Sequence, residues 1–295
     1  MYSGGVASWD AARMCVEKYG AEDVDLLFTD TLHEDKDLYR FIVEGAAALF
    51  GQSVTEELHA GIQDIDDIWI PGEVERRKTT LRHLAELSER LIPGFYWRGG
   101  DETLWESFDR NRALGSSRLQ FCSKDLKVKP SNKFIKQRYK PGEVTLHFGL
   151  DWSETARLNK VVANRAPHLV STDYHDSQRS HSDAAESLGE YGIALPALYG
   201  LGFLHNNCSG FCVKAGQRHF AHLLEARPEL YEFAEIREEG FRRYINKNVS
   251  ILKDRRGVKP GQKAKPLTLK ALRERLQGGA EVDQYDLGAC GCFIG

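Results

Sequence analysis

The sequence predicts an α/β protein in which short buried strands alternate with amphipathic helices along the first half of the chain. The run from Val24 to Asp30 is apolar and ends in polar residues, as a buried parallel strand does when its carboxyl end faces a site. An apolar spacing typical of a helix follows from about Lys36 to Phe50. A chain of 295 residues can also bury a sizeable core. These observations favour helices packed on a parallel sheet.

The other expected elements follow in chain order. A glycine-rich loop over 3–8 opens a helix that ends near 20, and Val54–Leu58 is a plausible strand. Further expected elements are a helix over 73–90, an aromatic and arginine-rich stretch over 95–118, a helix over 131–139 and a strand over 144–150. Beyond about 171 we expect mainly helices, over 182–191, 213–224, 229–245 and 268–276. The chain therefore divides into an α/β domain over 1–170 and a mostly helical, cysteine-bearing region over 171–295.

Charge and hydropathy exclude several classes of protein. With 40 Lys plus Arg against 43 Asp plus Glu, the net charge is −3, so no basic field over the whole chain points to nucleic acid or an anionic membrane. The longest nearly apolar stretch, 46–50, is far too short to span a bilayer, and the N-terminus lacks the pattern of a signal peptide. We expect a cytoplasmic protein with no membrane partner.

One basic stretch stands out locally. The segment 255–266 is rich in Lys, Arg, Pro and Gly and has no apolar period, which predicts a linker or mobile loop. It is the best local candidate for contacting nucleic-acid phosphates, and it could also close over a nucleotide.

The loop at the start of the first expected helix could hold phosphate. Ser3, Gly4, Gly5 and Ser8 combine glycines with small hydroxyls, which lets backbone N–H groups approach an anion at the positive end of a helix. The spacing is neither that of a Walker loop nor that of the dinucleotide fingerprint. A tight turn capped by Ser8 is the alternative. No apolar strand precedes the loop, which leaves open what fills the centre of the expected sheet.

Four segments in the same order carry a family resemblance. Ser3-Gly-Gly-x-x-Ser8 resembles the pyrophosphate loop of the ATP-pyrophosphatase superfamily, and Asp30-Thr-Leu-His33 is similar to a segment of the phosphoadenosine phosphosulfate reductase family. The segments 122–130 and 149–157 resemble two further motifs of that family. Four matches in order are more specific than any one of them.

The resemblance implies a Rossmann-like, five-stranded parallel sheet of the PP-loop type, with an adenine nucleotide at the carboxyl ends of the strands. It implies that the loop residues Ser3, Gly4, Gly5 and Ser8 hold phosphate or sulfate. Asp30 would lie near the ribose or a magnesium ion, and Lys127 and Arg157 would pair with anionic groups of the nucleotide. The superfamily loop usually has an acid where this chain has Ala7, so that either Asp10 or Asp30 could substitute for it.

The cysteines suggest a second centre. Cys208 and Cys212 form a compact pair, and their separation from Cys122 is similar to that in the iron–sulfur branch of the sulfonucleotide reductases. Cys122, Cys208, Cys212 and Cys290 would then hold a four-iron cluster, since four thiolates are the usual ligand set. Zinc is the second choice of metal, and buried or incidental thiols are the bland alternative. Cys15 lies on the apolar side of the first helix and is expected to pack in the core.

The C-terminal tail supplies the candidate nucleophile. Cys290-Gly291 resembles the C-terminal Cys-Gly with which reductases of this family attack sulfonyl sulfur, and Cys292 is the other candidate. A thiolate is the reactive form in either role. The tail cysteine that does not hold metal would be free to react.

Two reactions and one non-catalytic role follow from the resemblance. In the first reaction, ATP adenylates an oxygen of a nucleic-acid or small-molecule acceptor, and sulfur from a donor then displaces AMP to give a thiolated product. In the second, a tail cysteine attacks the sulfur of a sulfonucleotide, and a thiol reductant completes the reduction. The third possibility is a nucleotide- or cluster-binding regulator, because fold does not fix function.

Overall fold

The computed structural model describes residues 1–70, 72–259, 261–282, 286 and 288 and divides the chain into two compact units. The first unit comprises Met1–Glu102 and Ser123–Ser209, and the second comprises Thr103–Cys122 and the described residues of 210–291. Residues 171–209, which we expected in the C-terminal region, thus belong to the first unit.

The first unit begins with alternating helices and strands. Its elements up to residue 102 are α1 (Val6–Tyr19), β1 (Leu26–Asp30), α2 (Lys36–Leu49), α3 (Glu56–Gln63), α4 (Val74–Leu91) and β2 (Phe95–Gly99). After the excursion into the second unit come α6 (Lys129–Arg138), β3 (Thr145–Leu146), α7 (Thr155–Arg165), β4 (Leu169–Val170), α8 (Asp173–Asp176), α9 (His181–Glu190) and α10 (Ala197–Gly200). Short π- and 3-10-helical turns cover Ala21–Asp23, Cys122–Val128, Trp152–Glu154 and Cys208–Gly210.

The α/β class is confirmed, while the sheet is less continuous than expected. Strand β1 pairs in parallel with β2, and β3 pairs in parallel with β4, so the described strands of this unit form two separate two-stranded sheets. The expected strand over 54–58 is wrong, because Thr55 caps helix α3 by accepting a hydrogen bond from the backbone of Leu58. Strand β2 falls in the aromatic stretch for which no strand was expected.

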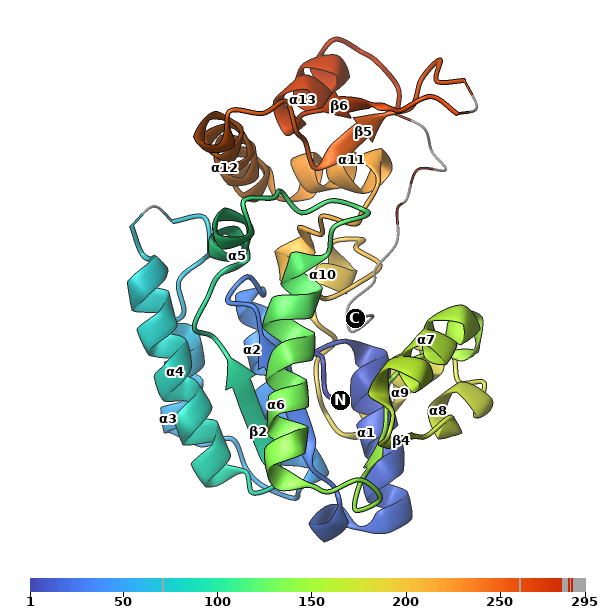
Figure 1. Cartoon of the computed structure of the whole chain (residues 1–295). Helices are drawn as coiled ribbons and strands as arrows, with labels where there is room; N and C mark the ends of the chain where they lie inside the picture. Colours follow the sequence, from blue (N-terminus) through green and yellow to red (C-terminus); the bar gives the residue numbers. More distant parts are fainter. Residues whose placement is uncertain (71, 260, 283–285, 287, 289–295) are drawn as a thin grey trace. The chain divides into compact units, whose positions relative to one another are not determined.

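Both faces of the β1–β2 pair are covered, as in a layered α/β fold (Figure 1). Phe28 and Trp97 face a large core that contains residues of α1, α2 and α4, whereas Leu27 faces a second core formed with α6, β3 and α7. This alternation follows from the two-residue period of a strand. The carboxyl ends of β1 and β2 are thereby fixed between packed helices.

The second unit is mainly helical. It contains α5 (Leu104–Asn111), α11 (Gln217–Ala226), α12 (Pro228–Ile245) and α13 (Leu269–Gln277), with an antiparallel hairpin of β5 (Leu252–Asp254) and β6 (Lys265–Leu267). The hairpin replaces the ends of the expected linker, and its exposed turn carries the basic residues of 255–265. None of the described helices in either unit is long and apolar enough to cross a membrane.

A close backbone approach gives a test of the first unit. A Cβ atom at Gly149 would lie 2.4 Å from the carbonyl oxygen of Ala7 and 2.5 Å from the nitrogen of Ser8. We predict that Gly149→Ala destabilises the protein by about 1–3 kcal/mol, because backbone must move to make room. Chemical denaturation measures this loss.

The matched control is Gly189→Ala in helix α9, where an added Cβ meets nothing within 4 Å. This substitution should be neutral or stabilise the helix by up to about 1 kcal/mol. Equal stabilities of the two variants would contradict the close packing of the 149 segment on the loop.

Candidate functional site

The glycine-rich loop is closed by its own hydroxyl. The backbone N–H of Ser3 donates to Ser8 Oγ at 3.1 Å, and that hydroxyl donates to the carbonyl of Gly5 at 2.7 Å. Gly4 has a φ of 83°, and a Cβ there would lie 2.8 Å from Leu38 Cγ, so only glycine fits. The loop leads into the 14-residue helix α1, whose first turn contains no acidic residue. Its N–H groups therefore lie in a field that favours an anion.

A distant segment of the first unit holds the loop in place. Asn206 Nδ2 donates to the carbonyl of Gly4 at 2.8 Å, and the N–H of Val6 donates to the Tyr199 hydroxyl at 3.4 Å. The Oδ1 atom of Asn206 is buried and has no hydrogen-bond partner within the described part of the chain. A buried acceptor without a partner is costly, so this amide oxygen is available to a donor that enters the site.

Asp30 lies at the carboxyl end of β1 and is almost fully buried. Its Oδ1 accepts from the backbone of Leu32 at 2.7 Å and from the Tyr39 hydroxyl at 2.8 Å, and its Oδ2 accepts from Trp97 Nε1 at 3.2 Å. Burial raises the pKa of this carboxyl to about 6, despite these donors. Asp30 thus supports the turn at Leu32, which has a left-handed φ of 59°.

A hollow of about 440 Å³ adjoins Asp30 at the ends of β1 and β2. Trp97, Arg98 and Gly99 line it from β2, and residues of α4, among them Arg82, line it from the opposite wall. Gly99 allows the strands to meet here, since a Cβ would lie 2.6 Å from the Asp30 carbonyl. Ligands of open α/β sheets bind at this edge, so the hollow extends the candidate site beyond the loop.

Behind this edge lies a buried ion pair. Lys127 Nζ lies 3.1 Å from Glu34 Oε1, and both side chains are at most 3% exposed. The other carboxylate oxygen of Glu34 accepts from the backbone N–H of Cys208. Lys127, which the resemblance assigned to the nucleotide, therefore lies near the expected edge but has its ammonium group beside Glu34.

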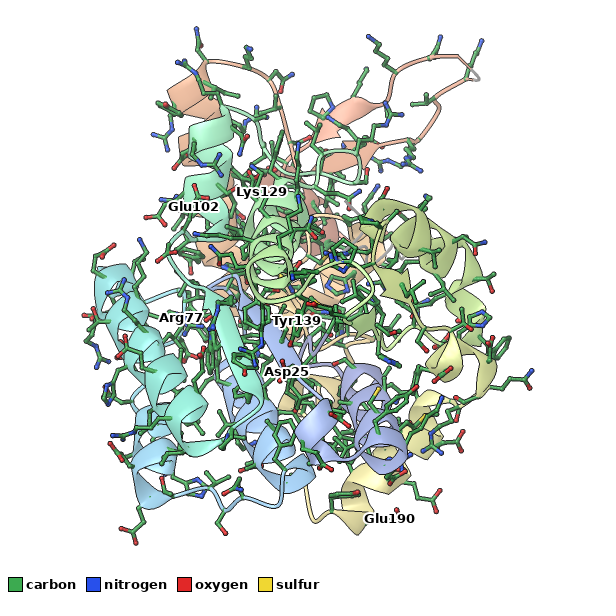
Figure 2. The ribbon with its side chains drawn as sticks, turned by 60° about the horizontal axis from the view of Figure 1, so that its bottom comes forward. Asp25, Arg77, Glu102, Lys129, Tyr139 and Glu190 are labelled. Carbon is green, nitrogen blue, oxygen red and sulfur yellow. The ribbon has the colours of Figure 1, made fainter. Side chains whose placement is uncertain are left out.

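Arg77 on α4 fixes the backbone between Asp30 and α2. Its Nε donates to the carbonyl of Leu32 at 3.0 Å, and its Nη2 donates to that of Glu34 at 2.6 Å. The side chain is buried, not part of a solvated basic face, as its position beside the strand pair illustrates (Figure 2). Ser209 Oγ adds a bond to the carbonyl of His33 at 3.0 Å. The segment after β1 is therefore rigidly held.

Two other predicted residues are engaged elsewhere. Arg157 forms an ion pair with Glu154 at the start of α7. Asp10, a candidate substitute for the loop acid, is fully buried between Arg13 at 2.9 Å and Arg179 at 2.5 Å. Its carboxylate is thus neutralised within the protein, which leaves Asp30 as the acid at the strand edge.

The cysteines are distributed over both units. Cys208 is buried in the first unit, whereas Cys122 and Cys212 are half-buried in the second, and all three are free thiols, as is the buried Cys15. Across the described ranges, no group of three or more His, Cys, Asp or Glu side chains is arranged to hold a metal ion. Cys290 and Cys292 lie outside the described residues. The described cysteines alone therefore do not make a cluster or zinc site.

Sequence reasoning missed the residues that build the site from behind. Arg77 and Glu34 bond to backbone groups, and such contacts leave no spacing in the sequence. Asn206 could have been found from its place before Cys208, which suggested a role in hydrogen bonding or a simple turn. Searches for similar proteins add no family: the chain matches no protein-family model, no curated protein and no solved structure.

His33 offers a direct test of this buried segment. Burial, and then the nearby Arg77 charge, lower its pKa from 6.5 to about 3. The unfolded chain therefore binds a proton that the folded chain does not, and stability is lost as the pH falls from 6.5 towards 3. At pH 5 this loss amounts to about 2 kcal/mol. We predict that His33→Gln, which cannot titrate, removes about that much of the difference in unfolding free energy between pH 7 and pH 5.

Denaturant unfolding at the two pH values measures the difference. His59→Gln on the exposed side of α3 serves as the control and should retain the wild-type difference. If His33→Gln also retained it, the buried neutral state of His33 would be wrong.

Proposed function

We propose that this chain is an adenine-nucleotide-binding enzyme with a Rossmann-like PP-loop fold, similar to the phosphoadenosine phosphosulfate reductase family, and that it carries out sulfur chemistry. The observation that carries the proposal is the loop over 3–8. It joins a glycine with positive φ to the start of a long helix beside the carboxyl end of a parallel strand. Backbone N–H groups in this setting suit phosphate.

The hollow beside Asp30 supports a nucleotide rather than a free phosphate. Its walls combine an indole, two arginines and the backbone of Gly99 and Gly100. An aromatic ring and guanidinium groups suit a base and a phosphate or sulfate, respectively. We propose that the loop takes the phosphates and that this hollow takes the rest of the nucleotide.

The favoured reaction is adenylation followed by sulfur transfer. An acceptor oxygen bonds to the α-phosphorus of ATP while the bond to the bridging oxygen breaks, and pyrophosphate leaves. A sulfur nucleophile from a thiolate or persulfide donor then bonds to the activated carbon of the acceptor, and AMP leaves with the oxygen. The role of the loop is to bind the charged groups and to stabilise the charge that develops on them.

The alternative is reduction of a sulfonucleotide by a cysteine. A thiolate attacks the sulfate sulfur, the nucleotide phosphate leaves, and an external thiol reduces the resulting S-sulfocysteine to release sulfite. Adenylation produces pyrophosphate and needs ATP, and reduction does neither. The same preparation can therefore be assayed for pyrophosphate with ATP and for sulfite with adenylyl sulfate or phosphoadenylyl sulfate.

A charge placed in the loop tests nucleotide binding. Gly5 has an ordinary φ of −92°, and a Cβ there meets its nearest neighbour at 3.7 Å, so a larger residue fits. We predict that Gly5→Asp lowers the affinity for ATP at least tenfold, because the carboxylate repels the phosphates. Isothermal titration calorimetry measures the affinity.

The matched control is Gly240→Asp, which adds the same charge to an exposed position of α12 with nothing within 4 Å. It should bind ATP as the wild type does. Equal affinity in both variants would contradict a phosphate site in the loop. Tight binding without pyrophosphate or sulfite release would favour the regulatory role instead.

The cysteines remain proposed ligands of a four-iron cluster, with zinc as the alternative, and no reaction step is assigned to either. We predict that protein purified without oxygen is brown and contains nearly equal iron and sulfide, and that Cys208→Ser and Cys212→Ser lower the iron content. Cys15→Ser is the control and should leave it unchanged. Colourless protein with one zinc would favour a structural site, and protein with neither metal would contradict the assignment.

A further inference from the structure

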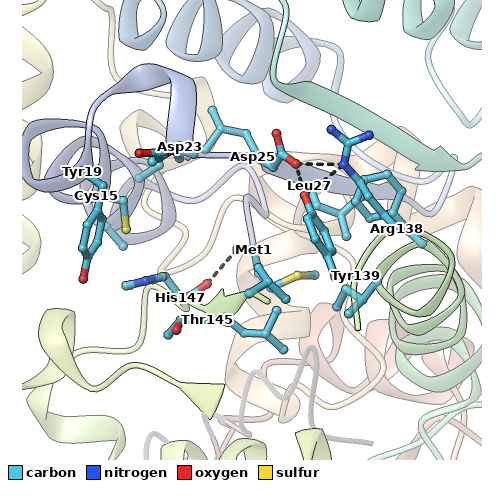
Figure 3. A pocket seen from close by; sticks show the side chains of 18 of the residues that line it. Met1, Cys15, Tyr19, Asp23, Asp25, Leu27, Arg138, Tyr139, Thr145 and His147 are labelled. Carbon is cyan, nitrogen blue, oxygen red and sulfur yellow. Dashed lines mark hydrogen bonds and ion pairs between the residues drawn. The ribbon is translucent and has the colours of Figure 1, made fainter. Parts of the chain in front are cut away.

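A narrow cavity lies between β1 and β3 in the first unit. It measures about 520 Å³ and has four walls (Figure 3). Two walls are the edges of β1 and β3, and the other two are helices α1 and α6. Strands in a sheet lie about 4.8 Å apart, so this is the cross-section that one further strand would occupy in a layered α/β fold. We call it the strand slot.

The first two residues already behave as the end of that strand. The N–H of Tyr2 donates to the carbonyl of Leu27 at 2.9 Å, towards β1. The amine of Met1 donates to the carbonyl of His147 at 2.7 Å, towards the segment that follows β3. Successive N–H groups that donate to opposite sides are the pattern of a central strand.

The same alternation gives the register of the empty part of the slot. Because the Leu27 carbonyl faces the slot, the peptide groups of Asp25 face it too, two residues earlier. The carbonyl of Leu146 bonds to Ser171 next to β4, so the peptide groups of Thr145 and His147 face the opposite way, into the slot. A strand that continued back from Met1 would meet Asp25 first and Thr145 next.

The walls indicate what kind of strand fits. Ala11, Ala12 and Cys15 line the slot from α1, and Phe134 and Ile135 line it from α6. Polar groups lie towards one side, where Asp25 is bonded to Tyr139 and to Arg138 (Figures 2 and 3). A strand covered by helices on both faces is apolar throughout, with β-branched residues favoured.

The Met1 amine argues that the strand is continuous with this chain. The amine is buried, and burial lowers its pKa to about 6, since the charged form loses its hydration. A peptide N–H at the same place would donate the same bond to His147 without a charge. A separate peptide would instead bring its own carboxyl end against this amine.

We propose that the strand slot binds an apolar β-strand of about four residues that runs parallel to β1 and is joined to the nitrogen of Met1. The strand links the β1–β2 pair to the β3–β4 pair and makes one parallel sheet of them. This inference rests on the slot alone and is independent of the proposed function.

Extended proteins test the proposal. Four residues, Val-Ile-Val-Val, are placed ahead of Met1, and Gly-Ser-Gly-Ser is placed there in the control. We expect the apolar extension to raise the Tm by at least 5 °C over the control and to slow hydrogen exchange at Asp25, Leu27, Thr145 and His147 at least tenfold. Equal Tm values with unchanged exchange would overturn the proposal.

Two further measurements keep the test decisive. A cysteine placed at each extension position in turn should cross-link under mild oxidation to Cys15 only at alternate positions, because alternate side chains of a strand face α1. Cross-linking at every position, or at none, would overturn the proposal. Free acetyl-Val-Ile-Val-Val-amide should give much less protection than the fused strand, and equal protection would show that the slot takes a separate peptide instead.

Discussion

The buried pair of Glu34 and Lys127 is the interaction on which the rest of the first unit depends. One carboxylate bonds to an ammonium from the π-helical turn before α6 and to the backbone N–H of Cys208. A buried charge without its partner is strongly destabilising, so these segments must assemble together. The pair fixes the backbone after β1, and that backbone in turn positions Asp30. The phosphate loop is held from the same side, since Asn206 lies two residues before Cys208.

Rigidity at the strand edge comes from polar groups, whereas its position comes from apolar packing. Trp97 illustrates both, because its ring stacks on Tyr39 with centroids 5.4 Å apart while its N–H bonds to Asp30. Arg77 adds donors to the carbonyls of the following turn. A site held this way needs little reorganisation when charge develops in it, which is the property that electrostatic catalysis requires.

Much of the fold could be predicted from local pattern, and the failures have physical causes. Helices α2 and α4 and strand β1 are confirmed, since each carries its own apolar period. The segment 54–58 fails because a capping threonine and two glutamates decide for a helix over a short apolar alternation. Strand β2 was missed since its pairing partner lies far away in the chain. In the site, the loop and Asp30 could be predicted from motifs, whereas Arg77 could not, because its acceptors are main-chain oxygens.

The span of the Glu34 network has a consequence for synthesis of the chain. Glu34 and Cys208 are 174 residues apart, so a ribosome completes most of the protein before the network can close. Until then, the nascent first unit holds a carboxylate and an ammonium group whose final neighbours are incomplete, and partly folded chains of this kind are prone to aggregate. Folding of this unit is therefore largely post-translational, and its rate should respond to chaperones that delay collapse of the first hundred residues.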